Sequence, residues 1–138
     1  MIDHCRSEIK QLHRFFEQWF QATIPNTDEA FARLPAVIHP SFALISPEGS
    51  RTERQALLTW IRNTHGARPS LRLWTEQIEP VYVETDLALL VYHEWQEGEA
   101  ARSARISSAL FRRAADAPCG VQWVHVHETW LPQPSSKS

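Results

Sequence analysis

Glycine is scarce in this chain, with four residues among 138. Loops that cradle phosphate groups use several glycines at fixed spacing, and the nucleophile turn of α/β-hydrolases has the pattern G-x-S-x-G. Neither pattern occurs in the sequence. The sequence therefore gives no support for a phosphate-cradling loop or for serine–histidine catalysis.

Cysteines and long apolar runs are also lacking. Cys5 and Cys119 are far apart and form no C-x-x-C pair, which predicts reduced thiols rather than a disulfide framework. No segment approaches the roughly 20 apolar residues of a membrane span, and the polar N-terminal segment has no apolar signal core. We therefore expect a cytoplasmic protein with no membrane partner.

The sequence has no excess of basic charge. The formal net charge is -2, and Lys and Arg are scattered, so the basic footprint that nucleic acid requires is missing. The hydrophobic content of 43% is ordinary for a globular domain. We predict a single domain over residues 1–131, a disordered tail over residues 132–138, and no cofactor.

The N-terminal part has the periodicity of an amphipathic helix. Apolar residues recur at alternating steps of four and three, at Cys5, Ile9, Leu12, Phe16 and Trp19. We expect Asp3 to cap this helix and Pro25 to end it near Thr23. His4 and His13 are predicted to face solvent.

Two shorter helices are predicted next. Thr27 offers a capping hydroxyl for a helix that Pro35 ends. The segment 52–55 has capping-box form and begins a helix that Gly66 can terminate. The apolar face of this second helix is formed by Leu57, Trp60 and Ile61.

The remainder reads as strands. A first strand over 42–46 is followed by a turn at 47–50, and a period of two from Ser70 predicts strands over 70–84, 86–97, 102–114 and 121–131. Short connections imply an antiparallel meander, with Pro80 as a candidate bulge. Helices first and strands afterwards indicate an α+β fold, in which a strongly curved sheet packs on the N-terminal helices as a cone with an internal pocket.

Several motifs carry a resemblance to a known superfamily. They are His39-Pro40-Ser41-Phe42, Ser46-Pro47-Glu48-Gly49, Tyr92-His93-Glu94-Trp95 and the closing string Trp123-Val124-His125-Val126-His127-Glu128-Thr129. In this order, over nearly the whole chain, they resemble the nuclear transport factor 2-like superfamily and its SnoaL-like group. The resemblance implies a cystatin-like cone that commonly dimerises through the outer face of its sheet. It implies no single activity, because isomerases, cyclases, dehydratases, hydrolases and association domains share the fold.

One activity of that superfamily can be tested by matching residues. The helix-one tyrosine of ketosteroid isomerase corresponds to Phe15, and its general base corresponds to Ser46. A phenyl ring donates no hydrogen bond, and a serine hydroxyl is a poor base at neutral pH. The isomerase mechanism is therefore not expected.

Strand parity predicts which residues face the pocket. On the last strand we assign Val124, Val126, Glu128 and Trp130 to the pocket, with Trp123 outside. Preceding strands contribute Val91, His93 and Trp95, then Arg105, Ser107, Ala109 and Phe111, which leaves Tyr92 and Glu94 on the other side. The predicted binding residues are Phe15, Trp19, Phe42, Trp60, His93, Trp95, Arg105, Ser107, Glu128 and Trp130.

His93 and Glu128 are the catalytic candidates, because either would act as a general base if the apolar pocket perturbs its pKa. The alternative, which we favour, pairs Glu128 with Arg105 as a structural salt bridge. We expect a homodimer that binds a small apolar or aromatic molecule carrying a polar group. If the protein also catalyses a reaction, we expect lyase, isomerase or hydrolase activity on that molecule.

Two other functions stay open. One is a non-catalytic association module whose role is the dimer itself. The other is a metal site at His125 and His127, whose side chains share one face of a strand. Only Glu94 or Tyr92 offers a further ligand, so we predict no metal and assign these histidines to the dimer interface.

Overall fold

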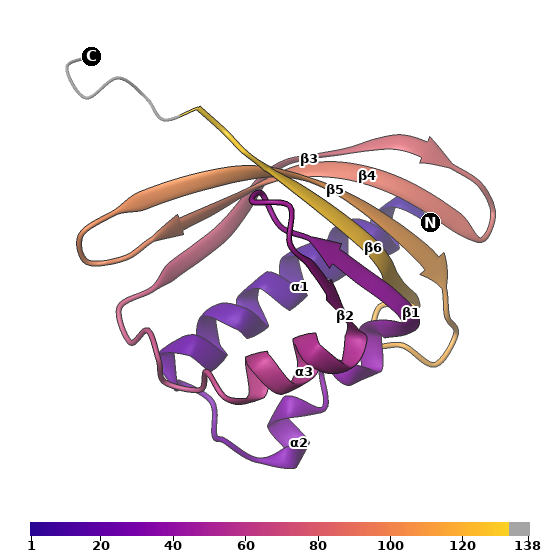
Figure 1. Cartoon of the computed structure of the whole chain (residues 1–138). Coiled ribbons are helices and arrows are strands. Elements are labelled where there is room, and N and C mark those ends of the chain that lie inside the picture. Colours follow the sequence, from indigo (N-terminus) through magenta and orange to yellow (C-terminus); the bar gives the residue numbers. More distant parts are fainter. Residues whose placement is uncertain (133–138) are drawn as a thin grey trace.

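The computed structural model describes residues 1–132, and Figure 1 shows its helices below a curved sheet. The elements run in the order α1 (Ile2–Gln21), α2 (Asp28–Phe31), a 3₁₀ turn η1 (Pro35–Val37), β1 (Ile38–Ile45), β2 (Arg51–Glu53), α3 (Arg54–Arg62), β3 (Arg72–Val83), β4 (Leu87–Glu97), β5 (Arg102–Arg113) and β6 (Val121–Trp130). The predicted α+β class is confirmed. The predicted tail lies outside the described residues, except for Pro132.

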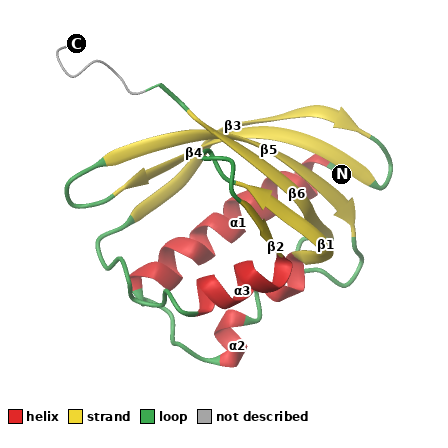
Figure 2. Cartoon of the chain, in the orientation of Figure 1, coloured by secondary structure: helices red, strands yellow, loops and turns green. Residues whose placement is uncertain are grey.

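One six-stranded sheet has the order β2-β1-β6-β5-β4-β3. Strands β3 to β6 form the predicted antiparallel meander. The sequence did not predict the short strand β2, nor the parallel pairing of β1 with β6. Figure 2 shows that the sheet curves over α1 and α3, so its concave face and the helices enclose the core.

Helix α1 buries the predicted stripe. Cys5, Ile9, Leu12 and Trp19 are buried, and Phe16 packs partly buried beside them. The predicted cap is wrong, because Met1 occupies the N-cap and Asp3 lies within the first turn. No helix within residues 1–132 combines the length and the apolar character of a membrane span.

The other two helix starts differ from each other. The Thr27 hydroxyl accepts a hydrogen bond from the Ala30 N–H at 3.2 Å, as predicted. The predicted capping box at 52–55 is wrong, because residues 51–53 pair as β2 and Glu53 caps α3 without a side-chain hydrogen bond. The predicted burial of Trp60 on α3 is also wrong. Its side chain is 56% exposed and does not belong to the buried face of the helix.

A bulge in β6 changes which side chains point inward. Leu110 pairs with His125 and Phe111 pairs with Trp123, so Val124 is the extra residue. Val126 and Glu128 point inward as predicted, but the bulge also turns Trp123 inward, where it is 2% exposed. The predicted position of Trp123 on the outer face is therefore wrong.

Strand β3 forms one edge of the sheet and is irregular. Its register with β4 shifts between Glu76 and Glu79 and again between Pro80 and Tyr82. Gln77 has a positive φ of 55°, in the left-handed region. The predicted bulge at Pro80 is confirmed.

The closed end of the cone holds a buried ion pair. Glu8 of α1 is fully buried, and the Arg33 guanidinium donates to its two carboxylate oxygens at 2.8 and 3.2 Å. The Trp123 indole N–H also donates to Glu8 Oε2 at 2.9 Å. Arg33 and Trp123 therefore compensate a carboxylate that the core could not otherwise accommodate.

We predict that Arg33→Ala will destabilise the protein by about 3–5 kcal/mol, because it leaves the Glu8 charge buried without its cation. Urea unfolding followed by tryptophan fluorescence measures the change. Arg51→Ala is the matched control, since Arg51 forms an exposed pair with Glu53 and should cost about 0–1 kcal/mol. Equal losses in the two variants would contradict a special role for the buried pair.

Candidate functional site

The cone contains a cavity in two neighbouring parts, which share several lining residues. The wider part, about 500 Å³, lies at the mouth between α1, α3 and the sheet. The deeper part, about 70 Å³, is walled mainly by apolar side chains of α1, α3, β1 and β6. Glu94 and Glu128 line both parts, so two carboxylates lie at the junction. The shallow grooves around His4 and Cys119 and around Pro40 and Arg54 have no buried charged side chain among their lining residues.

His13 of α1 holds Glu94 of β4 in place. Its Nδ1 lies 2.8 Å from the Ile9 carbonyl oxygen and its Nε2 lies 3.0 Å from Glu94 Oε1. A carbonyl oxygen only accepts hydrogen bonds, and an ionised carboxylate also only accepts. Both ring nitrogens of His13 therefore carry protons, and the pair is an imidazolium with a carboxylate, buried between helix and sheet.

The pKa directions agree with this ion pair. Burial alone would lower the pKa of His13, but the hydrogen bond and charge of Glu94 outweigh it and raise the pKa above its ordinary value. Burial alone would raise the pKa of Glu94. The hydrogen bond and charge of His13, with the Arg105 charge, outweigh burial and lower this pKa to about 2. Each group keeps its partner ionised.

Arg105 of β5 lies between the two carboxylates. Its Nη1 donates to Glu128 Oε1 at 3.1 Å, and its Nε lies 4.0 Å from Glu94 Oε2. The Trp130 ring lies over the guanidinium, 4.6 Å from ring centroid to Cζ, and its indole N–H donates to Glu48. The pairing of Glu128 with Arg105 that we favoured is therefore present. Burial, followed by the Glu94 charge, raises the pKa of Glu128.

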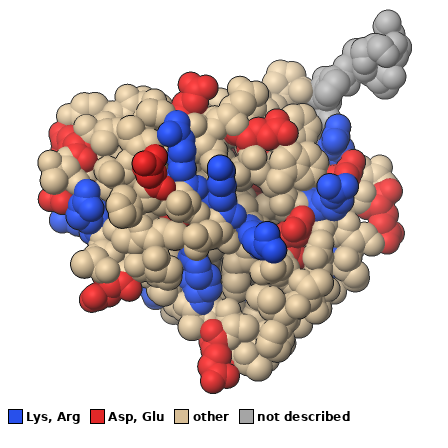
Figure 3. Space-filling model, turned by 180° about the vertical axis from the view of Figure 1, so that it is seen from behind, with Lys and Arg blue, Asp and Glu red and all other residues tan. Residues whose placement is uncertain are grey.

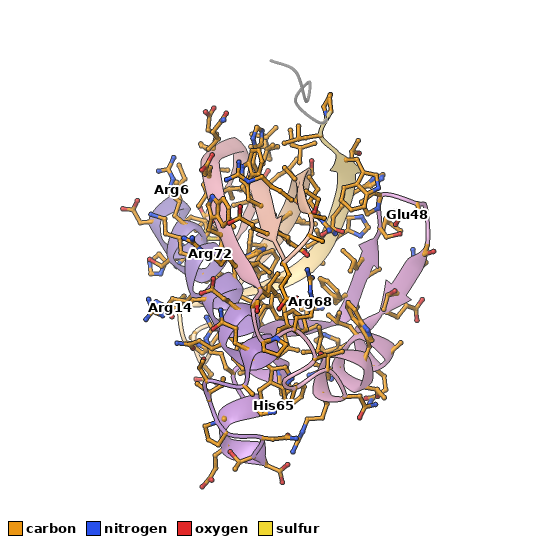
Figure 4. All side chains as sticks on the ribbon, turned by 90° about the vertical axis from the view of Figure 1, so that its left-hand side faces the viewer. Arg6, Arg14, Glu48, His65, Arg68 and Arg72 are labelled. Carbon is orange, nitrogen blue, oxygen red and sulfur yellow. The ribbon has the colours of Figure 1, made fainter. Side chains whose placement is uncertain are left out.

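The network continues toward the mouth through an amide. Gln96 Nε2 donates to Glu94 Oε2 at 2.7 Å, and Gln96 Oε1 accepts from Arg68 Nη1 at 2.9 Å. Figure 4 shows Arg68 between the sheet and the helices. Polar groups thus run from His13, deep in the cone, to Arg68 at its opening.

Two polar atoms of β5 that face the cone have no hydrogen-bond partner within residues 1–132. They are the Nε of Arg105 and the Oγ of Ser107, both buried. Ser107 pairs across the strands with Tyr92 on one side and Glu128 on the other, so the three side chains share the concave face. Both atoms are enclosed by the protein, and an ordered water is the usual partner of buried polar atoms of this kind.

The structure places eight of the ten predicted binding residues in three groups. Phe42, Trp60, Arg105 and Glu128 line the cavity, and Ser107 lies beside it. Phe15 and Trp19 are buried in the helix core instead, where their rings stack at 5.7 Å. Trp130 is 43% exposed and lies at the rim against Arg105.

His93 and Trp95 do not face the cavity, so their predicted orientation is wrong. Tyr92 and Glu94 point inward in their place and are 2% and 7% exposed. Trp95 stacks on Trp74 across the outer face, with ring centroids 6.1 Å apart. Of the two catalytic candidates, only Glu128 reaches the cone.

His13 is the residue that the sequence analysis missed. His13 lies four residues after Ile9 and three before Phe16, so it belongs to the apolar stripe of the helix. This spacing already indicated that the side chain faces the core. The prediction that His13 faces solvent is wrong, since it is 4% exposed. Glu8, three residues after Cys5, gave the same signal.

The H-x-H pair gains no further ligands. His125 is half-buried and His127 exposed, on the outer face of β6. Within residues 1–132, no group of three or more His, Cys, Asp or Glu side chains is placed to hold a metal ion. The structure therefore gives no support to a metal site there.

The His13–Glu94 pair predicts a pH window for stability. The raised pKa of His13 adds stability that is present below its ordinary value of 6.5 and is lost as the pH rises through the folded-state value. The lowered pKa of Glu94 adds stability that is present above 4.5 and is lost as the pH falls toward about 2. This pair therefore contributes most between about pH 4.5 and 6.5.

Urea midpoints measured from pH 3 to 9 check this window, and His13→Gln should flatten the alkaline decline. His4→Gln, at an exposed histidine, is the control and should keep it. An unchanged pH profile for His13→Gln would contradict the ion pair.

With the geometry established, comparison with known proteins identifies the family. The model of the family "Sucrose-6-phosphate phosphohydrolase C-terminal" matches residues 5–132. The chain belongs to this family. Sucrose-phosphatase 2 of Nicotiana tabacum is 30% identical over 127 residues, which cover 90% of this chain and 30% of that protein. The chain thus spans about a third of the length of such relatives.

Solved structures show the superfamily. An NTF2-like protein of unknown function from Pseudomonas aeruginosa has 27% identity and a TM-score of 0.84, and the match covers 94% of this chain and 99% of that one. A CaMKII hub from S. rosetta, at 12% identity and a TM-score of 0.62, covers 86% and 92% and shares the fold alone. The predicted nuclear transport factor 2-like superfamily is confirmed. The matching family within it is named for sucrose-6-phosphate phosphohydrolase instead of a SnoaL-like group.

Proposed function

We propose that this chain is a ligand-binding domain whose cone receives a small carbohydrate-type molecule. The observation that carries the proposal is the composition of the mouth cavity, where a polar network meets the exposed ring of Trp60 and the partly buried rings of Phe16 and Phe20. Its volume of about 500 Å³ falls within the range of about 300–1,000 Å³ that is usual for small-ligand sites. The proposal keeps the pocket expected from the sequence and replaces the apolar guest with a hydroxylated one.

The polar side of the cavity suits hydroxyl groups. A sugar hydroxyl both donates and accepts hydrogen bonds, so its site needs both kinds of partner. Glu94 and Glu128 supply acceptors, while Arg68, Arg105 and the Gln96 amide supply donors. Neutral hydroxyls are also provided around the mouth, by Ser46, Thr52 and Thr64.

The opposite wall suits the apolar face of a sugar ring. Trp60 of α3 is 56% exposed yet lines the cavity, beside Phe16 and Phe20 of α1. Large exposed aromatic side chains recur at binding surfaces, because their flat faces bury much apolar area on contact. A ligand covering Trp60 would account for its position.

The family supports the same chemistry. Its name and the tobacco relative both refer to an enzyme of a sugar phosphate, so a carbohydrate is the ligand class that the comparisons favour. Binding alone fulfils the proposed function. If turnover accompanies it, Glu128 is the general base that we propose, since its raised pKa and its position in both parts of the cavity suit that role.

We predict that sucrose binds the protein and that Trp60→Ala weakens binding about tenfold, or 1.4 kcal/mol. Isothermal titration calorimetry measures the affinity. Because Trp60 is largely exposed, the substitution should change the free energy of unfolding by only about 0.5 kcal/mol. Trp74→Ala, on the outer face, is the matched control and should bind normally. Absence of binding by sucrose and by a panel of neutral sugars would contradict the proposal.

Self-association through the outer sheet face is our second proposal. Half-buried apolar residues form this face without a covering element among the described residues, and they include Leu89, Val91, Ile106 and Leu110. A second copy would cover the same face symmetrically, as homodimer interfaces do. Figure 3 shows that both acidic and basic side chains occur on the surface seen from behind.

We expect sedimentation equilibrium to show a dimer, and Ile106→Asp to shift it to monomer by placing a charge in the interface. Asp replacement of Thr59, which is exposed on α3, should leave the dimer intact. A wild-type monomer at all accessible concentrations would overturn this second proposal.

A further inference from the structure

Two histidines of β6 lie next to each other on the outer face of the sheet. His125 and His127 flank Val126, whose side chain lines the cone, so both imidazoles point away from it. Their strand is one of the two central strands, because the sheet order is β2-β1-β6-β5-β4-β3. The pair therefore occupies the middle of the outer face instead of its edge.

A single chain cannot complete a metal site around this pair. A structural Zn²⁺ ion takes four protein ligands. Glu94 and Tyr92, the further ligands considered from the sequence, line the inside of the cone. No group of three His, Cys, Asp or Glu side chains forms within residues 1–132, and residues 133–138 contain none of these residue types. The missing side-chain ligands would therefore come from another molecule.

The neighbouring strands place apolar side chains beside the histidines. Leu110 of β5 pairs with His125, and Leu89 of β4 pairs with Leu110, so apolar residues extend the row of His125 across the outer face. Both leucines are half-buried, as is Ile106 farther along β5. Apolar residues of this kind form the centre of homodimer interfaces.

The charged residues on the other side of the pair favour a second copy of the same chain. Across β1, Glu53 of β2 lies in the row of His125 and Arg51 lies in the row of His127. One acidic and one basic side chain next to each other are complementary to the same two side chains turned by a two-fold axis. A second copy therefore meets no excess of like charge there, unlike a strongly acidic or basic partner.

A two-fold axis that passes beside β6 brings the two histidine pairs together. In a symmetric contact of this kind, residues near the axis meet their own counterparts. Packed sheets lie about 10 Å apart, so an ion midway between them lies about 5 Å from each sheet. The two copies then supply four imidazoles, which is the number that tetrahedral zinc requires.

We propose that two copies of this chain bind one Zn²⁺ ion between their outer sheet faces, with His125 and His127 of each copy as the four ligands. This inference rests on the proposed self-association and adds an ion to that interface. Imidazole nitrogens suit zinc, whereas Mg²⁺ prefers oxygen ligands. Zn²⁺ should therefore strengthen the dimer, and Mg²⁺ should not.

Sedimentation velocity of the full chain in EDTA, in ZnCl₂ and in MgCl₂ tests the inference. An ion that binds only the dimer lowers its dissociation constant about tenfold when the free ion is at about ten times its own Kd. We expect this shift with Zn²⁺ and no shift with Mg²⁺. Elemental analysis of the isolated dimer should give one zinc for every two chains.

The readout for variants is the ratio of the dimer dissociation constants without and with Zn²⁺. His127→Gln should bring this ratio close to one, because a zinc ligand is lost from each copy. His93→Gln is the matched control, since His93 lies on the same outer face but on β4, in a different row. It should keep the full ratio. Circular dichroism melting confirms that both variants fold.

The outcomes separate the zinc site from self-association. A dimer of equal strength in EDTA and in ZnCl₂ overturns the zinc site and leaves self-association standing. A monomer under every condition overturns both. A zinc response that survives in His127→Gln, or one zinc bound to each monomer, contradicts a site shared between two copies.

Discussion

The hydrogen bonds of His13 are the constraint on which the interior of this cone depends. One ring nitrogen is anchored to the carbonyl of Ile9 in the same helix, and the other reaches a carboxylate of the sheet. Glu94 would otherwise be a buried charge without compensation, which is costly. The cation is supplied by α1. The packing of this helix on the sheet therefore also keeps Glu94 ionised.

Two charged clusters occupy opposite ends of the cone, and they differ in accessibility. At the closed end, Glu8, Arg33 and Trp123 satisfy one another, and the carboxylate is fully buried. At the open end, Arg105 lines a cavity, and the exposed Arg68 uses one guanidinium nitrogen, Nη1, in its side-chain hydrogen bonds within residues 1–132. The first cluster fixes the fold, whereas the second has bonding capacity to offer a guest.

The helix and strand periodicities were enough to predict the α+β class and the antiparallel meander, because most elements bury one face. The periodicities failed where the two faces of a strand carry similar types of residue. In β4, Tyr92 and Glu94 alternate with His93 and Trp95, so bulky and polar residues occur on both sides and parity alone could not assign the inner one. The inner side is set by α1, whose His13 supplies the partner of Glu94.

Trp123 shows a second limit of sequence reasoning. Counting in steps of two from Glu128 places it outside, and only the extra residue Val124 turns it inward. A bulge of this kind leaves no obligatory residue type in the sequence. Conversely, Arg105, Ser107, Val126 and Glu128 lie in regular stretches, and for them the alternation was sufficient.

The irregular edge strand β3 has a consequence for how copies of this protein can meet. A straight, unpaired edge invites another strand to extend the sheet, which leads to aggregation. Here the left-handed Gln77 and the missing N–H of Pro80 interrupt the free hydrogen-bonding row twice. An edge interrupted in this way is a poor template for a strand of a second molecule, so it disfavours a continuous sheet from one molecule to the next.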